Sequence, residues 1–181
     1  MTKQSERVIL VDHRDTPIGI EEKARAHAEA KLHRAFSVFI FDDAGRMLLQ
    51  RRALTKYHSA GLWSNTCCSH PRPGESTMGA AHRRLMEEMG FDCPLRTAFS
   101  FVYRVDLGGI YEHEYDHVFL GRFNGVPQPD PVEVEEWCWL GVPQAYGELA
   151  SRPGAFTCWF RIAFAELEAR GLLIPAARVA R

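Results

Sequence analysis

Residues 63–90 read W-S-N-T-C-C-S-H-P-R-P-G-E-S-T-M-G-A-A-H-R-R-L-M-E-E-M-G, and we expect a short strand, a loop and a helix in that order. Ser76 is the expected N-cap, because its hydroxyl can accept a hydrogen bond from the free amides of the first helical turn. Gly90 stands where a helix end favours a residue with positive φ. One strand–loop–helix unit therefore brings thiols and an imidazole close to a helix. The loop residues with this chemistry are Cys67, Cys68 and His70.

The predicted helix has one apolar stripe and one charged face. Met78, Ala81, Leu85 and Met89 follow one another at spacings of three, four and four, so their side chains share a stripe that must pack on the rest of the fold. The charged face has two interpretations. It is either a solvated face with ion pairs beside a buried structural thiol, or part of a site for a cation and a phosphate group. Its residues are Arg83, Arg84, Glu87 and Glu88.

The composition predicts one soluble globular domain over residues 1–181. Apolar residues make up 46% of the chain and charged residues 25%, as in ordinary globular proteins. The net charge of -1 gives no reason to expect nucleic acid or a membrane surface as a partner. The five cysteines are an odd number and no signal-like apolar segment opens the chain, so we expect a cytoplasmic protein with reduced thiols. Few features suggest a dimer, and a monomer is expected.

The charges are unevenly distributed along the chain. Residues 23–56 contain eight basic and three acidic residues, whereas residues 87–136 contain eleven acidic and three basic ones. One segment could hold an anion and the other a cation, which would suit a metal–phosphate ligand. Chance clustering is the alternative.

The rest of the chain alternates predicted strands and helices. Several of the strands are joined as hairpins, which predicts an α/β or α+β sandwich in which helices cover a mixed sheet. In the last helix Phe160, Ala163, Phe164 and Leu167 share a face, and Trp159 lies off it. We expect strands at 7–11, 34–41, 47–50, 96–106, 110–123 and 137–140, a turn at 16–19, and helices at 21–31, 143–149 and 157–170.

Three of the eight histidines form a possible imidazole set, although eight histidines offer many such triples, and two glutamates form a separate candidate site for a cation. His27 and His33 are six residues apart and cannot share a helix face, so the chain must leave the helix between them to bring both rings together with that of His70. Glu112 and Glu114 are two apart in a predicted strand and point to one face. Two carboxylates on one face repel each other unless a cation or proton lies between them. Taken singly, each feature also fits a structural histidine or an exposed strand face.

Seven segments together resemble the type 1 isopentenyl-diphosphate isomerases, and the resemblance runs from about residue 18 to residue 161. Their order and spacing make the match specific. The implied fold is the Nudix fold, a mixed sheet sandwiched between helices, with extensions at both ends of the chain. The segments are L-H-R-A-F-S (32–37), R-R-A-L-T-K (51–56), W-S-N-T-C-C-S-H-P (63–71), G-E (74–75), R-R-L-M-E-E-M-G (83–90), E-H-E (112–114) and F-T-C-W (156–159).

The helix at 77–89 looks like a degenerate Nudix box. Arg84 stands where that box expects a glutamate. Hydrolysis by Nudix enzymes needs several helix carboxylates to hold metals and activate water, so a cation at this position favours direct contact with a diphosphate. The box residues that do match are Glu75, Arg83, Glu87, Glu88 and Gly90.

The resemblance implies two metal ions. One Mn²⁺ or Mg²⁺, with Zn²⁺ as a further candidate, would bind three imidazoles and two carboxylates. A second ion, Mg²⁺, would arrive with the substrate diphosphate and be held by Glu88. The ligands of the first ion would be His27, His33, His70, Glu112 and Glu114.

The resemblance also implies the remaining roles. Cys68 would be the catalytic thiol, and only one of the two adjacent cysteines should face the pocket, because neighbouring strand residues point in opposite directions. Glu114 would be the second acid/base, supported by Tyr103, and Trp159 would cover the hydrocarbon end of the substrate. The diphosphate oxygens would contact Lys23, Arg52, Lys56 and Arg84.

The implied reaction converts isopentenyl diphosphate into dimethylallyl diphosphate for isoprenoid biosynthesis. It adds a proton at C4 and removes one from C2, so two groups that face each other across the substrate are expected. Two other functions stay open at this point. A Nudix-type diphosphate hydrolase would share the fold and the cations, and in a metal-stabilised binding module the histidines and glutamates would be purely structural.

Overall fold

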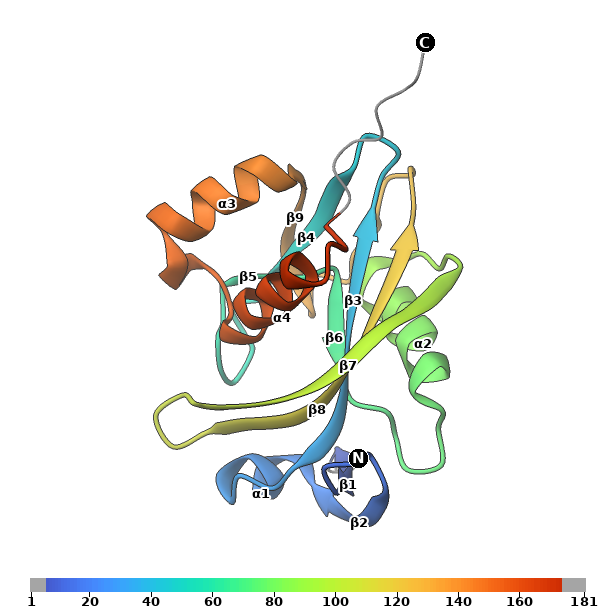
Figure 1. The fold of residues 1–181 in the computed structure, drawn as a ribbon, viewed down its shortest axis with the longest axis vertical. Coiled ribbons are helices and arrows are strands. Elements are labelled where there is room, and N and C mark those ends of the chain that lie inside the picture. The colour runs from blue at the N-terminus through green and yellow to red at the C-terminus, as the bar shows by residue number, and fades with distance from the viewer. Residues whose placement is uncertain (1–5, 174–181) are drawn as a thin grey trace.

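Strand β3 (His33–Phe41) pairs with more strands than any other strand in the described part of the sheet (Figure 1). The computed structural model describes residues 6–173. In it β3 pairs antiparallel with three strands and parallel with one. The antiparallel partners are β1 (Arg7–Val11), β4 (Arg46–Arg52) and β6 (Cys67–Ser69), and the parallel partner is β8 (Tyr111–Arg122).

The other strands extend this core, and helices cover it. β2 (Pro17–Glu22) pairs with β1, β5 (Trp63–Ser64) and β9 (Val134–Gly141) pair with β4, and β7 (Leu95–Asp106) pairs with β8. Within residues 6–173 the α-helices are α1 (Lys23–Ala28), α2 (Thr77–Met89), α3 (Val142–Ser151) and α4 (Cys158–Ala169), with a 3₁₀ turn at Pro153–Ala155. The prediction of a mixed α+β sandwich is confirmed.

The alternation of β3 determines which helix each face of the sheet carries. Phe36, Val38 and Ile40 pack in the cluster that contains the buried side of α2. Phe39 and Phe41 point the other way and pack with α4. Successive strand residues face opposite sides, so the apolar run of β3 fills two cores at once. The sheet therefore lies between α2 and α4, as Figure 1 shows.

Helix α2 begins and ends as the sequence predicts. The Ser76 hydroxyl accepts a hydrogen bond from the Gly79 amide at 3.1 Å, and Gly90 closes the helix with φ +71°. Ala81, Leu85 and Met89 of the predicted stripe are buried against the sheet, and Met78 packs at the margin of that cluster. Burial of this stripe fixes the opposite, charged face toward the pocket described below.

Three local predictions are wrong. Residues 16–19 are not an isolated turn, because Pro17 begins strand β2, which pairs with β1 from Glu22 back to Pro17. The first helix begins at Lys23 and ends at Ala28 rather than spanning 21–31, since this pairing keeps residues 21 and 22 extended. Cys67 and Cys68 lie in strand β6, not in a loop, because they pair with Val38 and Ser37 of β3.

Other predicted elements are confirmed within a few residues. The strand expected at 137–140 is longer, Val134–Gly141, because it pairs along the whole of β4. Trp159 is only 5% exposed, so its position off the predicted apolar stripe does not place it in solvent. None of the helices described in residues 6–173 has the length and apolar character that a membrane span requires.

Replacing Gly90 by Ala is expected to destabilise the protein more than replacing Gly74. Both glycines have positive φ, which costs an Ala about 1–2 kcal/mol. At Gly90 an added Cβ would also lie 2.2 Å from the Gln128 carbonyl oxygen, whereas at Gly74 it would meet nothing within 4 Å. The steric term adds about 1–3 kcal/mol. Urea unfolding of both variants measures the difference, and equal losses would contradict this account of the α2 terminus.

Candidate active site and metal centre

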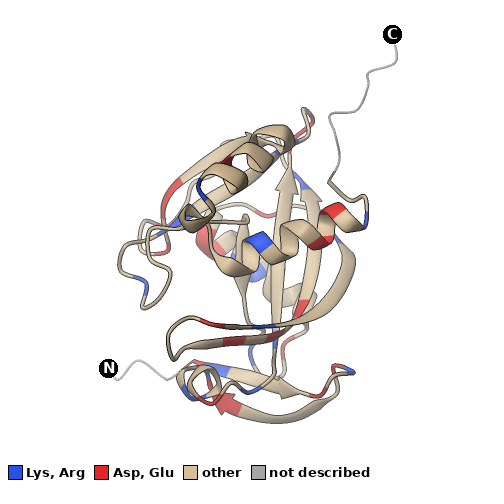
Figure 2. Cartoon of the chain, turned by 60° about the vertical axis from the view of Figure 1, so that its left-hand side comes forward, with Lys and Arg blue, Asp and Glu red and all other residues tan. Residues whose placement is uncertain are grey.

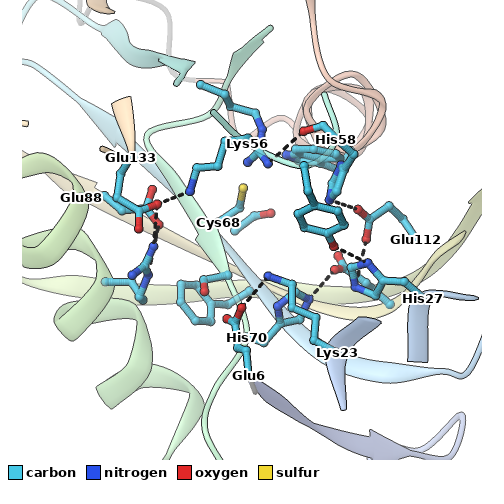
Figure 3. Close-up of a pocket in the computed structure, with 18 of the residues that line it drawn as sticks. Glu6, Lys23, His27, Lys56, His58, Cys68, His70, Glu88, Glu112 and Glu133 are labelled. Carbon is cyan, nitrogen blue, oxygen red and sulfur yellow. Dashed lines mark hydrogen bonds and ion pairs between the residues drawn. The ribbon is translucent and has the colours of Figure 1, made fainter. Parts of the chain in front are cut away.

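A single pocket of about 1290 Å³ collects the predicted site residues. It lies where α1, β6, the charged face of α2, β8 and the N-terminal end of α4 meet. Figure 3 shows Cys68 between two sets of side chains. Lys56, Glu88 and Glu133 lie on one side, and a histidine-rich set that includes His27 and His58 lies on the other. All predicted site residues line the pocket except His33, which is fully buried.

The histidine-rich side contains a compact set of possible metal ligands. His27, His33, His70 and Glu114 each offer one ligand atom, and these atoms lie within 4.8 Å of one another. The His70 Nε2 atom is 2.8 Å from Glu114 Oε1 and 3.2 Å from His33 Nε2. His27 comes from α1 and His33 from β3, so the chain leaves the helix between them, as their spacing predicts.

Hydrogen bonds and burial prepare these imidazoles to bind a cation. His33 Nδ1 donates to the Lys31 carbonyl at 2.8 Å, which leaves the Nε2 lone pair directed into the group. His27 Nε2 is buried and has no hydrogen-bond partner. Burial lowers the pKa of His27 to about 3 and also lowers the pKa of His70. Both rings are therefore neutral near pH 7, which is the form that ligates metals.

The two glutamates of the E-H-E segment point to the pocket side, as predicted, but their environments differ. Burial, followed by the charge of Glu114, raises the pKa of Glu112. Burial alone would also raise the pKa of Glu114, but contacts with His33 and His70 hold it well below its ordinary value. The Tyr103 hydroxyl donates to Glu114 Oε2 at 2.5 Å. A divalent cation at this point would favour the ionised form of both carboxylates, so the residues present fit a metal site.

His58 and Tyr57 belong to this group, and sequence reasoning missed them. His58 Nε2 lies 3.3 Å from Glu112 Oε1, and His27, His58 and Glu112 form a second set of potential ligands. The Tyr57 hydroxyl is 2.8 Å from His27 Nδ1. Both residues come from the irregular segment between β4 and β5, where no periodic pattern indicates the direction of a side chain. The adjacent K-Y-H triplet was the only available signal.

Cys68 faces the pocket and Cys67 does not, as the alternation of a strand predicts. Cys67 is fully buried in the core beneath α2, whereas Cys68 lines the pocket. In the β3–β6 ladder Cys68 lies opposite Ser37, whose hydroxyl donates to Asp116 at 2.8 Å. Burial raises the pKa of Cys68 to about 12, so the thiol is protonated near pH 7.

The opposite side of the pocket carries the basic residues and two acidic ones. Arg84 Nη2 lies 2.6 Å from Glu88 Oε1 and 3.2 Å from Glu133 Oε2. Lys56 also pairs with Glu133, a residue that sequence reasoning did not select. Lys23 lines the pocket on the metal-ligand side and pairs with Glu6 at 3.0 Å.

Trp159 forms part of the pocket wall. Its indole N–H donates to the Ser64 hydroxyl at 2.9 Å, which fixes the ring. The Arg52 guanidinium lies 5.1 Å from the ring centroid, and the His58 ring lies 5.8 Å away. The Arg52 contact is a cation–π interaction, in which the electron-rich face of the indole attracts positive charge.

The uneven charges of the sequence meet at this site. Along the whole ribbon, basic and acidic residues are interspersed rather than divided into two halves (Figure 2). Part of the pocket's charge comes from these two segments: Lys23, Arg52 and Lys56 belong to the basic one, and Glu88, Glu112, Glu114 and Glu133 to the acidic one. Arg84 and Glu6, which also line the pocket, lie outside both segments.

Comparison with known proteins assigns the family. The NUDIX domain matches residues 31–160. The isopentenyl-diphosphate Delta-isomerase of Burkholderia multivorans is 58% identical over 156 residues, which cover 86% of this chain and 89% of the relative. The enzyme of the same name from Serratia proteamaculans is 53% identical over 156 residues, covering 86% and 87%. The chain belongs to the isopentenyl-diphosphate Delta-isomerase family.

Solved structures agree with the fold. A protein from Deinococcus radiodurans superposes with a TM-score of 0.69 at 20% identity, over 81% of this chain and 90% of that one. The MutT protein of Methanosarcina mazei superposes with a TM-score of 0.64 at 20% identity, over 77% of this chain and 95% of that one. At these identities the likeness shows the shared fold alone.

Binding of a divalent cation near pH 7 is expected to release on the order of one proton, from Glu112. A carboxyl group with a raised pKa keeps its proton at a pH where an ordinary glutamate has lost it, and the cation must displace that proton. The metal affinity should therefore increase with pH. Titration calorimetry with Mn²⁺ in buffers of different ionisation enthalpy counts the protons. Glu112→Gln should lose the release and the exposed control Glu135→Gln should keep it; an unchanged count in Glu112→Gln would contradict the assignment.

Proposed function

We propose that the chain isomerises isopentenyl diphosphate to dimethylallyl diphosphate with Cys68 and Glu114 as the two groups that exchange protons with the substrate. The observation that supports this most is their placement on one face of the sheet. Cys68 of β6 pairs with Ser37 of β3 and Glu114 of β8 pairs with His33 of the same strand, so both side chains enter the pocket from strands that pair with β3. One can protonate C4 while the other accepts the proton from C2.

The metal centre would hold Glu114 in place. His27, His33, His70, Glu112 and Glu114 would bind one Mn²⁺ or Mg²⁺, or alternatively Zn²⁺. When bound, such an ion supplies positive charge that stabilises the buried carboxylates. Tyr103, which donates to the second oxygen of Glu114, would orient that oxygen toward the substrate.

The basic side of the pocket would anchor the diphosphate, which takes no part in bond breaking. Lys56 points into this side from the segment between β4 and β5, and Arg84 from α2. Arg52 lines the pocket beside Trp159, and Lys23 lines it on the metal-ligand side. Glu88 would hold a Mg²⁺ that arrives with the diphosphate. Anchoring the charged end fixes the position of the alkene against the two proton-transfer groups, which lowers the entropic part of the barrier.

Trp159 would stabilise the positive charge that forms at C3 after protonation. An aromatic face contributes about 2 kcal/mol to a desolvated cation. The ring is 5% exposed and fixed through Ser64, so it can cover the hydrocarbon end and keep water away from C3. Water at this carbon would convert the cation to an alcohol.

We further propose that the protein acts as a single domain and as a monomer in the cytoplasm, without nucleic acid or a membrane as partner. The balanced net charge and the single connected sheet support this proposal. Its only partner in the reaction would be the small-molecule substrate.

Incubation with isopentenyl diphosphate in D₂O, in the presence of Mg²⁺ and Mn²⁺, is expected to give deuterated dimethylallyl diphosphate by NMR. Cys68→Ala and Glu114→Gln should each lower kcat about 10²- to 10⁴-fold, because each removes one proton-transfer group. Cys93→Ala, which changes a thiol outside the pocket, should leave kcat near the wild-type value.

Two results would contradict the proposal. Release of phosphate or pyrophosphate without isomerisation would indicate a Nudix-type diphosphate hydrolase. Near-normal isomerisation by Cys68→Ala or Glu114→Gln would show that the proton-transfer roles are assigned to the wrong residues.

A further inference from the structure

Glu133 connects the two basic residues on the diphosphate side of the pocket. Its Oε2 atom pairs with Lys56 and lies 3.2 Å from Arg84 Nη2 (Figure 3). The backbone of Glu133 is fixed on both sides: its amide donates to the Asp130 carbonyl at 3.0 Å, and its carbonyl accepts from the Ala53 amide at 3.0 Å. The carboxylate is therefore held at the pocket by the fold and is not a freely rotating surface group.

The same nitrogen of Arg84 joins Glu133 to Glu88. Arg84 Nη2 is 2.6 Å from Glu88 Oε1. Glu88 is only 4% exposed, and its other oxygen accepts from Gln50 Nε2 at 2.8 Å, so its direction is fixed as well. Two carboxylates from different elements, α2 and the segment before β9, thus converge with one cationic nitrogen between them. Without a cation at that point their charges would repel each other.

A diphosphate that binds Arg84 would compete with Glu88 and Glu133 for its guanidinium group. Lys56 and Arg84 are the groups proposed to contact the diphosphate oxygens, and each phosphate contact draws positive charge away from Glu133. A hard divalent ion can replace it, because Mg²⁺ in proteins is typically held by one or two carboxylates together with substrate phosphates. Glu88 alone supplies one carboxylate, and Glu133 is in position to supply the other.

We propose that Glu133 is the second carboxylate, with Glu88, of the site that holds the diphosphate-borne Mg²⁺. This inference rests on the proposed function, because it assumes that Lys56 and Arg84 bind a diphosphate. In the substrate-free pocket Glu133 pairs with both cations and keeps them oriented. In the substrate complex it faces the Mg²⁺ ion that accompanies the diphosphate.

Glu133 could instead be only a counter-ion of Lys56 and Arg84, and the variant Glu133→Gln distinguishes this role from Mg²⁺ binding. If Glu133 only competes with the diphosphate for Lys56 and Arg84, then Glu133→Gln strengthens diphosphate binding equally with and without Mg²⁺. If Glu133 holds Mg²⁺, the same variant loses the gain in affinity that Mg²⁺ provides. The dependence of affinity on Mg²⁺ therefore separates the two roles.

The experiment measures binding of inorganic pyrophosphate by titration calorimetry, with and without Mg²⁺, to the full chain loaded beforehand with one equivalent of Mn²⁺. The wild type should bind pyrophosphate more tightly with Mg²⁺. Glu133→Gln should reduce that gain about tenfold or more, and Glu88→Gln should do the same. Without Mg²⁺, Glu133→Gln should bind at least as tightly as the wild type. The matched control is Glu135→Gln, an exposed carboxylate two residues further along in strand β9, which should keep the wild-type gain.

A wild-type Mg²⁺ gain in Glu133→Gln, or no Mg²⁺ gain in the wild type itself, would overturn the inference. Circular dichroism of each variant establishes that the chain is folded. Because pyrophosphate has no alkene, the outcome is independent of isomerisation. If the wild type shows the Mg²⁺ gain but no isomerisation in D₂O, the proposed reaction fails while the role of Glu133 stands.

Discussion

The register between β3 and its two neighbours is the constraint on which the site depends. Parallel pairing with β8 places Glu114 beside His33, and antiparallel pairing with β6 places Cys68 beside Ser37. A shift of one residue in either ladder would turn the thiol or the carboxylate to the other face of the sheet. The register is fixed because β3 is apolar on both faces and fills the cores under α2 and α4 at once. The geometry of the reactive groups is thus a consequence of core packing.

Burial of charge is the second constraint, and it explains why the pocket has two sides. Glu112 and Glu114 are 3% and 8% exposed, which would be costly for two neighbouring carboxylates without a compensating group. Three imidazoles and a phenol provide that compensation, and a divalent ion would complete it. On the other side Arg84 lies between Glu88 and Glu133, so the substrate-free pocket is close to neutral there as well. Binding of the substrate would therefore replace ion pairs between these basic residues and the glutamates with ion pairs between the basic residues and the diphosphate.

Part of this site follows from sequence because the groups lie on regular elements. The two-residue spacing of Glu112 and Glu114 predicts one face of a strand, and the capped helix 77–89 predicts where Arg84 and Glu88 lie. The family resemblance supplied the ligand set, and no periodic pattern could have done so. His58 and Glu133 were missed because they lie in an irregular segment and at a strand entry, where direction depends on tertiary contacts. The errors at residues 16–19 and 21–22 have a similar origin, since pairing with β1 overrides the local preference for a turn in the first stretch and for a helix in the second.

The central claim is that the histidine–glutamate group holds a metal that serves the reaction and is not required for the fold. Removal of bound metal with a chelator, followed by thermal unfolding and an isomerase assay on the same sample, tests this claim directly. In the described part of the chain neither hydrophobic core includes any of these ligands, so the stripped protein should unfold cooperatively but be inactive, and added Mn²⁺ or Mg²⁺ should restore activity. A stripped protein that is unfolded would show a structural metal, and one that is folded and fully active would show that the group takes no part in the reaction.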